Sequence, residues 1–268
     1  MTRATLPQAT LRQAAVDILL TADPAEKVSK TYDAAAAWQR GEMDVGEGVA
    51  PERPARPAKP ELRTPAEMPR RSTGPKGRIA LVHALAHIEL NAVDLAWDVV
   101  ARFGGLGLPR GFLNDWVDVA KEEAEHYAAL AAHLETLGTR YGDLPAHDGL
   151  WQAAMVTAHD LAARMAIIPM TLEARGLETT PPTCVKLRQA GAEDTAAILD
   201  TIYTDEIKHL AVGVRWFEHV CAARGDEPVA TFAKLLKQCF IGPLKPPFNM
   251  DARRQAGMRE AYLRPWMA

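Results

Sequence analysis

The stretch TDEIKHLAVG, residues 204–213, places a glutamate and a histidine on what reads as the buried face of a helix. Glu206 and His209 stand three residues apart, so they share one helical face. The neighbours on that face are apolar or small: Ile202, Gly213 and Phe217. Burying a carboxylate and an imidazole costs free energy unless a partner compensates them. The stretch therefore predicts a helix whose inner face holds a functional group.

A second stretch, KEEAEHYAAL at residues 121–130, repeats the spacing Glu-x-x-His with Glu123 and His126. An acid directly precedes each pair: Glu122 stands before Glu123, and Asp205 stands before Glu206. A single match is expected by chance, whereas two matches on apolar faces are not. The alternative is that these are surface acids placed by coincidence.

Two further helices each carry one glutamate on an apolar face, Glu89 and Glu173. Glu89 precedes Glu123 by 34 residues, and Glu173 precedes Glu206 by 33. Two helical hairpins thus present a glutamate and then Glu-x-x-His in the same order and at nearly the same distance. The repeat predicts that all four helices turn these side chains toward one interior.

Hydrophobic periodicity predicts an all-α fold built on a four-helix bundle, with strand signals nearly absent. Glycine follows the last turn of each predicted helix, as is usual at helix C-termini. The twelve-residue connection GTRYGDLPAHDG is long enough to cross a bundle. The predicted helices span residues 76–103, 110–137, 148–175 and 192–224.

The chain is predicted to form one globular domain with added segments at both ends. Seven prolines between residues 50 and 75 exclude a helix there and predict an extended linker or strap. Residues 52–78 hold eight lysines and arginines against three glutamates, a local charge of +5. We favour a solvated strap over a nucleic-acid-binding arm. The predicted segments are an N-terminal helical segment (1–49), the strap (50–75), the bundle (76–225) and a C-terminal helix with a closing segment (226–268).

Composition indicates a soluble protein: of 268 residues, 48% are apolar and 24% are charged, with a net charge of −3. This balance argues against a general nucleic-acid or membrane binder. The three cysteines form no paired pattern, which favours a reducing compartment. We find no secretory signal and no apolar run approaching the length of a transmembrane helix. We therefore expect a cytoplasmic protein.

The four glutamates and two histidines predict a dinuclear metal site. Four carboxylates and two imidazoles in one interior require a large compensating positive charge, which two divalent cations would supply. Oxygen donors with one nitrogen per metal suit iron or manganese, and the lack of thiolates argues against structural zinc.

The chain resembles the ferritin-like di-iron carboxylate superfamily and, more closely, a bacterial ferritin-like family of uncharacterised function. The resemblance covers most of the chain from about residue 76. It is carried by these stretches: HALAHIELNAVDLAWD, YGDLPAHDGLW, EARGLETTPP, TDEIKHLAVGVRWF and PPFNMDARRQAG.

The resemblance implies a ligand set. One metal would be held by Glu89, Glu123 and His126, and the other by Glu173, Glu206 and His209. Glu123 and Glu206 would bridge the two ions. Asp205 and Glu122 match positions where a carboxylate accepts a hydrogen bond from the far nitrogen of a ligand histidine. For Glu122, a plain surface acid is the alternative.

The resemblance also implies the cofactors and the reaction class. We expect two iron ions, with manganese at one or both positions as the alternative, and O2 as co-substrate. The first hypothesis is an O2-dependent oxidoreductase or hydroxylase acting on an unidentified small organic molecule or a tRNA base, with an unidentified electron donor. The second is iron oxidation or handling, and the third is a bundle with a structural metal. No membrane partner is expected, and a homodimer is left open.

Other polar residues are given structural roles. Tyr203, three residues before Glu206, is a weak candidate for a redox or hydrogen-bonding tyrosine, and a packed core tyrosine is preferred. His83 and His87 are four residues apart, a spacing that could by itself bind a metal. His87 lies about 200° around the helix from Glu89, so His87 and Glu89 cannot easily share one metal. His87 is predicted to join a polar stripe that includes Asn91, Asp94 and Asp98. The C-terminal arginines are taken as surface residues: Arg253, Arg254 and Arg259.

Overall fold

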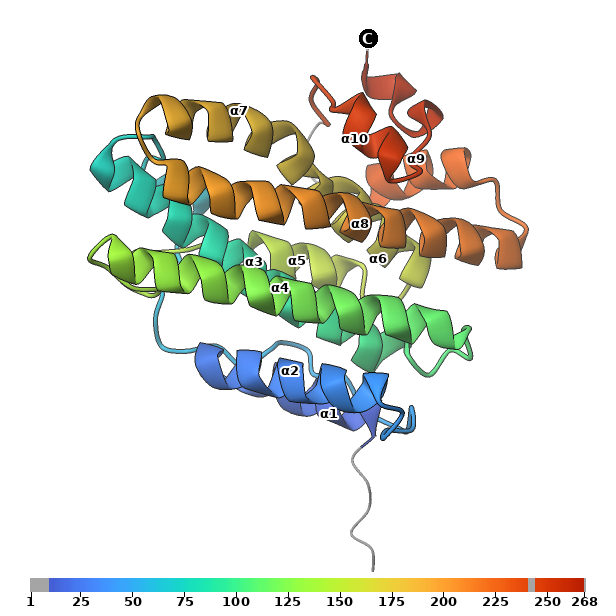
Figure 1. Ribbon diagram of the computed structural model, residues 1–268. Coiled ribbons are helices and arrows are strands. Elements are labelled where there is room, and N and C mark those ends of the chain that lie inside the picture. Colours follow the sequence, from blue (N-terminus) through green and yellow to red (C-terminus); the bar gives the residue numbers. More distant parts are fainter. Residues whose placement is uncertain (1–9, 241–243, 268) are drawn as a thin grey trace, which may run out of the picture.

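The protein is described here by a computed structural model that covers residues 10–240 and 244–267, in which every regular element is helical. The all-α bundle predicted from the sequence is confirmed (Figure 1). An isolated bridge between Leu62 and Ala146 is the β-type pairing seen within the described ranges. The predicted N-terminal and C-terminal segments also include residues 1–9, 241–243 and 268, which lie outside the described residues.

Three long helices form the centre of the bundle: α3 (Pro75–Phe103), α4 (Arg110–Thr136) and α8 (Glu193–Arg224). Helices α3 and α4 form a hairpin and pack along their length, and α4 also contacts α8 (Figure 1). Their bounds lie within a residue of those predicted. Local signals explain this agreement, because Pro75 occupies the first position of α3 and Gly225 ends α8 with a φ of 72°.

The third predicted helix, 148–175, is broken, and the prediction that it ends at Gly176 is wrong. Asp160 begins a new helix because its side chain accepts a hydrogen bond from Ala162 N at 3.1 Å. Gly176 lies inside a continuing helix. The segments in order are α5 (Gly149–Val156), α6 (Leu161–Ile167), the π-helix η2 (Ile168–Leu172), the 3-10 turn η3 (Glu173–Arg175) and α7 (Gly176–Gln189).

The π-helix η2 contains Pro169, which cannot donate a regular helical hydrogen bond. Pro169 has no N–H to donate, and the Thr171 hydroxyl donates to Ala166 O at 2.7 Å. Opposite this turn, α8 carries Gly213, where an added Cβ would lie 2.7 Å from the ring carbons of Pro169. The backbone of α8 therefore packs directly against the proline ring, four residues before Glu173.

Helix α7 tolerates prolines because the C-terminal segment replaces a lost hydrogen bond. Pro181 cannot donate to Leu177 O, and the side-chain amide of Asn249 donates to that carbonyl at 3.0 Å instead. The residue that completes the helix is thus 72 positions away in the sequence.

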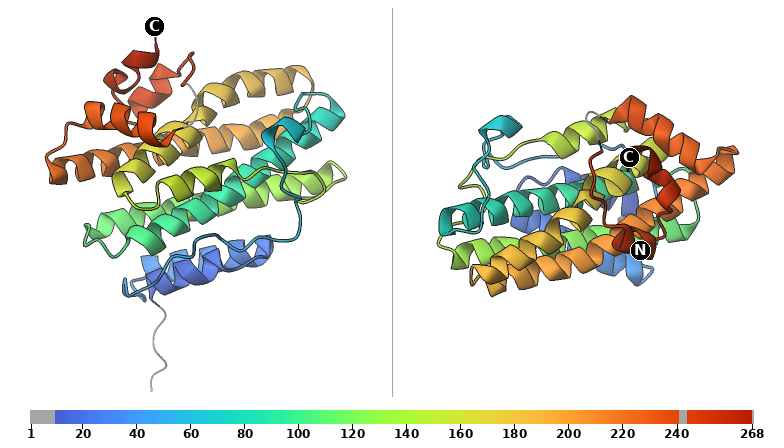
Figure 2. Two further views of the ribbon diagram at one scale, coloured as in Figure 1. Left: turned by 180° about the vertical axis from the view of Figure 1, so that it is seen from behind. Right: turned by 90° about the horizontal axis from the view of Figure 1, so that it is seen from above.

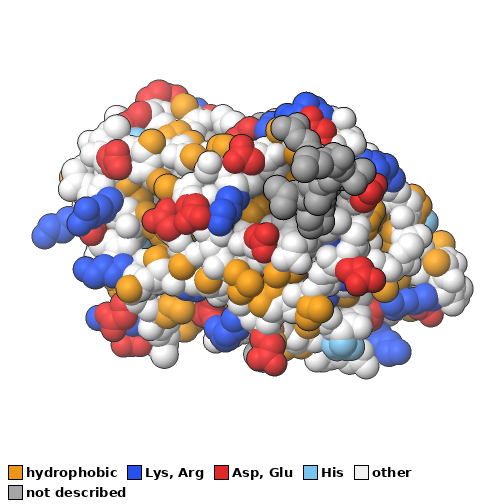
Figure 3. Space-filling model, turned by 90° about the horizontal axis from the view of Figure 1, so that it is seen from below, with side chains coloured by type: hydrophobic (Ala, Val, Ile, Leu, Met, Phe, Trp, Pro, Cys, Tyr) orange, Lys and Arg blue, Asp and Glu red, His pale blue; other side chains and the backbone are white. Residues whose placement is uncertain are grey.

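Shorter helices cover the outside of the bundle. Helices α1 (Leu11–Leu19) and α2 (Pro24–Gln39) lie at the bottom of Figure 1, against α3 and α4. Figure 3 shows that face, where charged side chains of both signs are interspersed with apolar ones. At the other end α9 (Pro228–Cys239) contacts α6 and α8, and α10 (Met250–Gln255) contacts α8 (Figure 2). Short 3-10 turns are η1 (Pro65–Glu67), η4 (Glu260–Tyr262) and η5 (Arg264–Trp266).

The proline-rich segment is a strap that lies on the body. Ala55 N donates to Leu19 O at 2.8 Å, and the indole of Trp151 donates to Glu52 O at 3.2 Å. Figure 2 shows the strap running along the bundle from α2 to α3. These bonds tie the N-terminal helices to the bundle.

The polar stripe on α3 faces neighbouring segments and is buried. Asp94 and Asp98 are fully buried, and each is ion-paired. The partners come from separate parts of the chain: Lys27 of α2 and Arg56 of the strap at Asp94, Arg102 of α3 and Arg164 of α6 at Asp98. The stripe therefore holds α2, the strap and α6 against α3.

By composition, α3 also resembles a membrane span, although no such apolar run was expected. An 18-residue window within Pro75–Phe103 has a mean hydropathy of 1.4, and 72% of that window is buried inside the bundle. The apolar surface of α3 is therefore that of a central core helix.

Candidate metal centre

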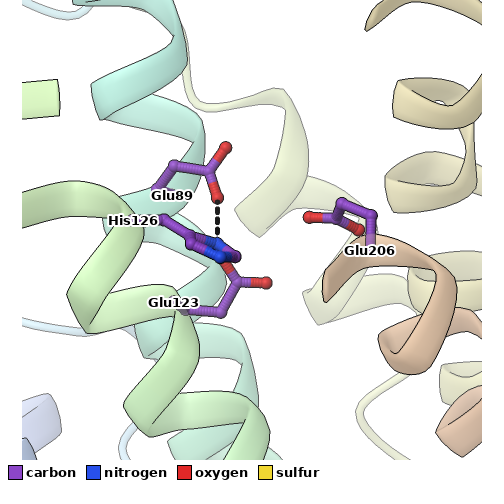
Figure 4. A group of neighbouring side chains, drawn as sticks. All are labelled: Glu89, Glu123, His126 and Glu206. Atoms are coloured by element: carbon purple, nitrogen blue, oxygen red, sulfur yellow. Dashed lines mark hydrogen bonds and ion pairs between the residues drawn. The ribbon is translucent and has the colours of Figure 1, made fainter. Parts of the chain in front are cut away.

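Four predicted ligands from three helices meet in the bundle interior. Glu89 of α3, Glu123 and His126 of α4, and Glu206 of α8 each offer an atom, and these atoms lie within 4.8 Å of one another (Figure 4). His126 Nδ1 is 3.4 Å from Glu89 Oε2 and 3.4 Å from Glu123 Oε2. The four side chains are buried, with Glu206 the most exposed at 9%.

His209 joins this group from α8. Its Nδ1 is 3.0 Å from Glu123 Oε1 and 3.9 Å from Glu206 Oε1, and its ring centre is 5.9 Å from that of His126. Glu123 therefore lies between the two imidazoles, with one oxygen toward each. That is the position expected of a carboxylate bridging two ions.

Glu173 approaches the group from η3, directly after the π-helix. Burial raises the pKa of its carboxyl well above the usual range, and the charges of Glu123 and Glu206 raise it further. Its carboxyl is therefore close enough to the cluster for these charges to act on it. Glu173 is not among the residues whose ligand atoms lie within 4.8 Å of one another, so its role as a ligand stays a prediction.

Each histidine of the cluster donates a hydrogen bond from Nε2 to an acid on the other helix, in a crosswise arrangement. His126 of α4 donates from Nε2 to Asp205 Oδ2 of α8 at 3.1 Å, and His209 of α8 donates from Nε2 to Glu122 Oε2 of α4 at 2.8 Å. Lys208 lies 2.7 Å from Asp205 and 3.8 Å from Glu122. With Nε2 donating outward, Nδ1 of each imidazole faces the cluster.

The interior of the cluster holds acceptors without donors. Within the described residues, the buried atoms lacking a hydrogen-bond partner include Glu89 Oε2, Glu123 Oε1, Glu206 Oε2 and His209 Nδ1. An unsatisfied buried polar atom costs about 1–3 kcal/mol, so four in one place require an explanation. All four atoms are oxygens or nitrogens of the kind that ligate iron or manganese, and no cysteine belongs to the cluster. The residues present fit a divalent metal site.

The electrostatics of the cluster reflect the same excess of negative charge. Burial raises the pKa of Glu89 and Glu206, and the charge of Glu123 adds to both shifts. Burial alone would also raise the pKa of Glu123, but the neighbouring His209 and a hydrogen bond from His126 lower it. Burial opposes charge on His126, yet the nearby carboxylates of Glu123 and Glu89 raise its pKa to about 11. The protein alone thus compensates these carboxylates with protons, which a divalent cation could replace.

Tyr203 is placed at the junction with the C-terminal segment. Its hydroxyl accepts a hydrogen bond from Asn249 Nδ2 at 3.0 Å, and its side chain is half-buried against the core. A redox role for Tyr203 stays a prediction.

Sequence reasoning missed a buried ion pair between α10 and α7. Arg253, expected on the surface, is fully buried and binds Glu178 with two bonds, Nε to Oε1 at 2.8 Å and Nη2 to Oε2 at 3.1 Å. The stretches EARGLETTPP and PPFNMDARRQAG contain the two partners. The pairing joins α10 to α7, the helix that follows Glu173.

Comparison with known proteins places the chain in a family. The family model described as "Protein of unknown function (DUF455)" matches residues 20–264. An uncharacterized protein of Haemophilus influenzae (strain ATCC 51907 / DSM 11121 / KW20 / Rd) is 42% identical over 213 residues, covering 77% of this chain and 74% of that relative. No solved structure gives a significant match. Because the family model spans all the elements that build the cluster, the chain belongs to the DUF455 family of proteins of unknown function.

Proposed function

We propose that the buried cluster is a dinuclear metal centre. The observation that carries the proposal is the convergence of three carboxylates and two imidazoles whose inward atoms lack hydrogen-bond donors. Glu89, Glu123 and His126 would hold one ion, and Glu206 and His209, with Glu173, would hold the other. The two Glu-x-x-His glutamates would bridge the ions.

The protein's own residues prepare the site in three ways. The crosswise bonds to Asp205 and Glu122 orient both imidazoles so that each Nδ1 faces the cluster. The surrounding core keeps bulk water from the carboxylates, since Glu89 and Glu123 are 3% and 1% exposed. The close contact of Gly213 with Pro169 sets where the chain enters Glu173.

We infer that two iron ions occupy the centre, with manganese as an alternative at one or both positions. Two ferrous ions held by these carboxylates would supply electrons for the reduction of O2. The function supported best is an O2-dependent oxidoreductase or hydroxylase of an unidentified organic molecule or tRNA base. The resemblance to the di-iron carboxylate superfamily supports this reaction class. Iron oxidation or handling at the same centre is the second candidate.

Metal analysis tests the proposal. The protein would be expressed in medium supplemented with iron and manganese, and metal per chain would be measured by elemental analysis. We expect about two ions per wild-type chain and fewer than about half an ion in the Glu206→Ala, His209→Ala variant. The matched control is Glu125→Ala, His219→Ala, which removes the same two side-chain types from exposed positions of α4 and α8.

The outcomes separate the candidates. A folded wild type without metal, or equal metal loss in both double variants, contradicts the metal centre. For a protein that does hold two irons, O2 uptake by the anaerobically reduced form is then measured with a Clark electrode. Uptake limited to about one turnover favours iron oxidation, whereas repeated turnover with an added electron donor favours the oxidoreductase.

A further inference from the structure

A narrow cavity lies on the side of α3 that faces away from the metal cluster. Its walls are the strap, α3 and the loop at residues 144–150. Its α3 residues recur at helical spacing: Ala80, His83, Ala84, His87, Ile88 and Asn91. At 100° per residue, Glu89 is centred on the opposite side of the helix, so this cavity is a separate site.

One wall presents a hydrogen-bond donor without a partner. His83 is 1% exposed, and its Nε2 accepts a hydrogen bond from Gly142 N–H at 2.9 Å. Burial lowers the pKa of His83, so the ring is neutral and its single proton must be on Nδ1. Among the described residues no hydrogen bond from that Nδ1–H is found, and His83 lines the cavity, so an acceptor bound there would satisfy it.

A second imidazole is fixed in the same way. Nδ1 of His147 accepts a hydrogen bond from Gly149 N–H at 3.3 Å, so the neutral ring carries its proton on Nε2. Burial lowers the pKa of His147, and the charge of Arg71 lowers it further. Arg71 is exposed at the rim of the cavity and has no ion-pair partner within the described residues. Two neutral donors and one cation thus border the cavity.

The acids near these imidazoles are already paired elsewhere. Asp143, which faces His83, accepts hydrogen bonds from Arg140 N and from the Thr139 hydroxyl, both at 3.1 Å. Asp148, which faces His147, forms an ion pair with Arg53 at 2.7 Å. The charge left uncompensated at the mouth is therefore that of Arg71.

The other cavity polar groups are also satisfied. His87 bonds to the Tyr141 hydroxyl at 2.8 Å and to His147 O at 3.2 Å. Asn91 donates to His87 O at 2.6 Å and accepts from Arg56. The remaining walls are largely apolar: Met68, Pro69, Ile88, Leu144, Pro145 and Leu150.

We propose that this cavity binds a small organic acid. Its carboxylate accepts hydrogen bonds from Arg71, His147 and His83, and its apolar body lies against Ile88, Leu144 and Leu150. An anion alone would leave the apolar walls uncovered, and a neutral apolar molecule would leave the donors unpaired. The site does not depend on the metal centre, because the two lie on opposite sides of α3.

Isothermal titration calorimetry on the full chain tests the proposal. The probes are benzoate, phenylacetate and hexanoate, with benzyl alcohol, acetate and inorganic phosphate for comparison. At least one of the three acids should bind at least about tenfold more tightly than benzyl alcohol, acetate and phosphate. Arg71→Ala should weaken that binding about tenfold. Arg70→Ala, which removes the adjacent exposed arginine from a neighbouring hollow, should leave it unchanged.

Each remaining outcome overturns the proposal. No binding of any of the three acids at 10 mM excludes an organic-acid site in this cavity. Phosphate or acetate binding as tightly as the acids shows that the apolar body contributes nothing. Equal weakening by the Arg70 and Arg71 substitutions shows that surface charge alone attracts the anion. Metal content should be the same in Arg71→Ala and wild type, which keeps this test distinct from that of the metal centre.

Discussion

Replacing Gly213 by alanine tests whether the contact between α8 and the π-helix positions the metal-binding face. In an ordinary helix this substitution stabilises by about 0.8–1.0 kcal/mol. Here the new methyl group would lie 2.7 Å from two ring carbons of Pro169, at least about 0.7 Å closer than carbon atoms normally approach. A proline ring cannot rotate away, so the cost should be near the upper end of the 1–3 kcal/mol typical of overpacking. The net expectation is a destabilisation of about 2 kcal/mol.

The matched control is Gly176→Ala at the start of α7. Gly176 has a helical φ of −55°, and no atom lies within 4 Å of an added Cβ. This variant should be unchanged or more stable by up to about 1 kcal/mol. The assay is urea unfolding followed by far-UV circular dichroism. The two alanine variants should therefore shift the unfolding midpoint in opposite directions.

A second readout connects this contact to the metal centre. Pro169 precedes Glu173 by four residues, so relief of the clash moves the backbone that carries Glu173. Metal per chain should fall in Gly213→Ala and remain unchanged in Gly176→Ala. If Gly213→Ala is at least as stable as the wild type and binds as much metal, the close contact does not constrain the site and the reasoning is refuted.

Three further predictions concern the buried polar groups. Asp98→Ala leaves the guanidinium of Arg164 buried without its carboxylate, so the free energy of unfolding, measured with urea, should fall by about 3–5 kcal/mol. Adding Arg164→Met should recover much of this loss, and no recovery would contradict the unpaired-charge explanation. Burial lowers the pKa of His83 below 6.5, so the stability that this neutral ring contributes is complete above pH 6.5 and declines as the pH falls. Between pH 7 and pH 5 the wild type should thus lose more unfolding free energy than His83→Asn, and equal losses would show that His83 is not responsible. Glu178→Ala removes the partner of buried Arg253, so limited proteolysis should cut the C-terminal segment at least about tenfold faster than in wild type. An unchanged rate would mean that the pair does not hold α10 to α7.

The candidate metal centre is the part of the molecule where sequence reasoning reached furthest. The three-residue spacing in each Glu-x-x-His and the apolar neighbours are local properties, so they place Glu123 and His126 on one inner face whatever the rest of the chain does. The structure brings Glu89, Glu206 and His209 to that face. Metal binding by these residues stays a prediction until metal is measured.

Contacts between distant residues could not be predicted in the same way. The family resemblance implied that Asp205 and Glu122 accept hydrogen bonds from ligand histidines, but it could not show that each acid serves the histidine of the other helix. That exchange depends on how α4 and α8 face each other. Likewise, the strap's arginines looked solvated, whereas Arg56 is paired with Asp94 in the interior.

The sequence by itself determined the three uninterrupted helices, their ends and the faces on which the acids lie, because periodicity, capping and glycine signals act within a few residues. Only the tertiary structure decided the path of the remaining helix. Gly176 predicted an end to the helix, yet the helical path continues through it and past several prolines because other segments compensate. Asn249 supplies the hydrogen bond that Pro181 cannot make, and Gly213 leaves room for Pro169. The lost local hydrogen bonds are thus replaced by partners that only the folded chain brings close.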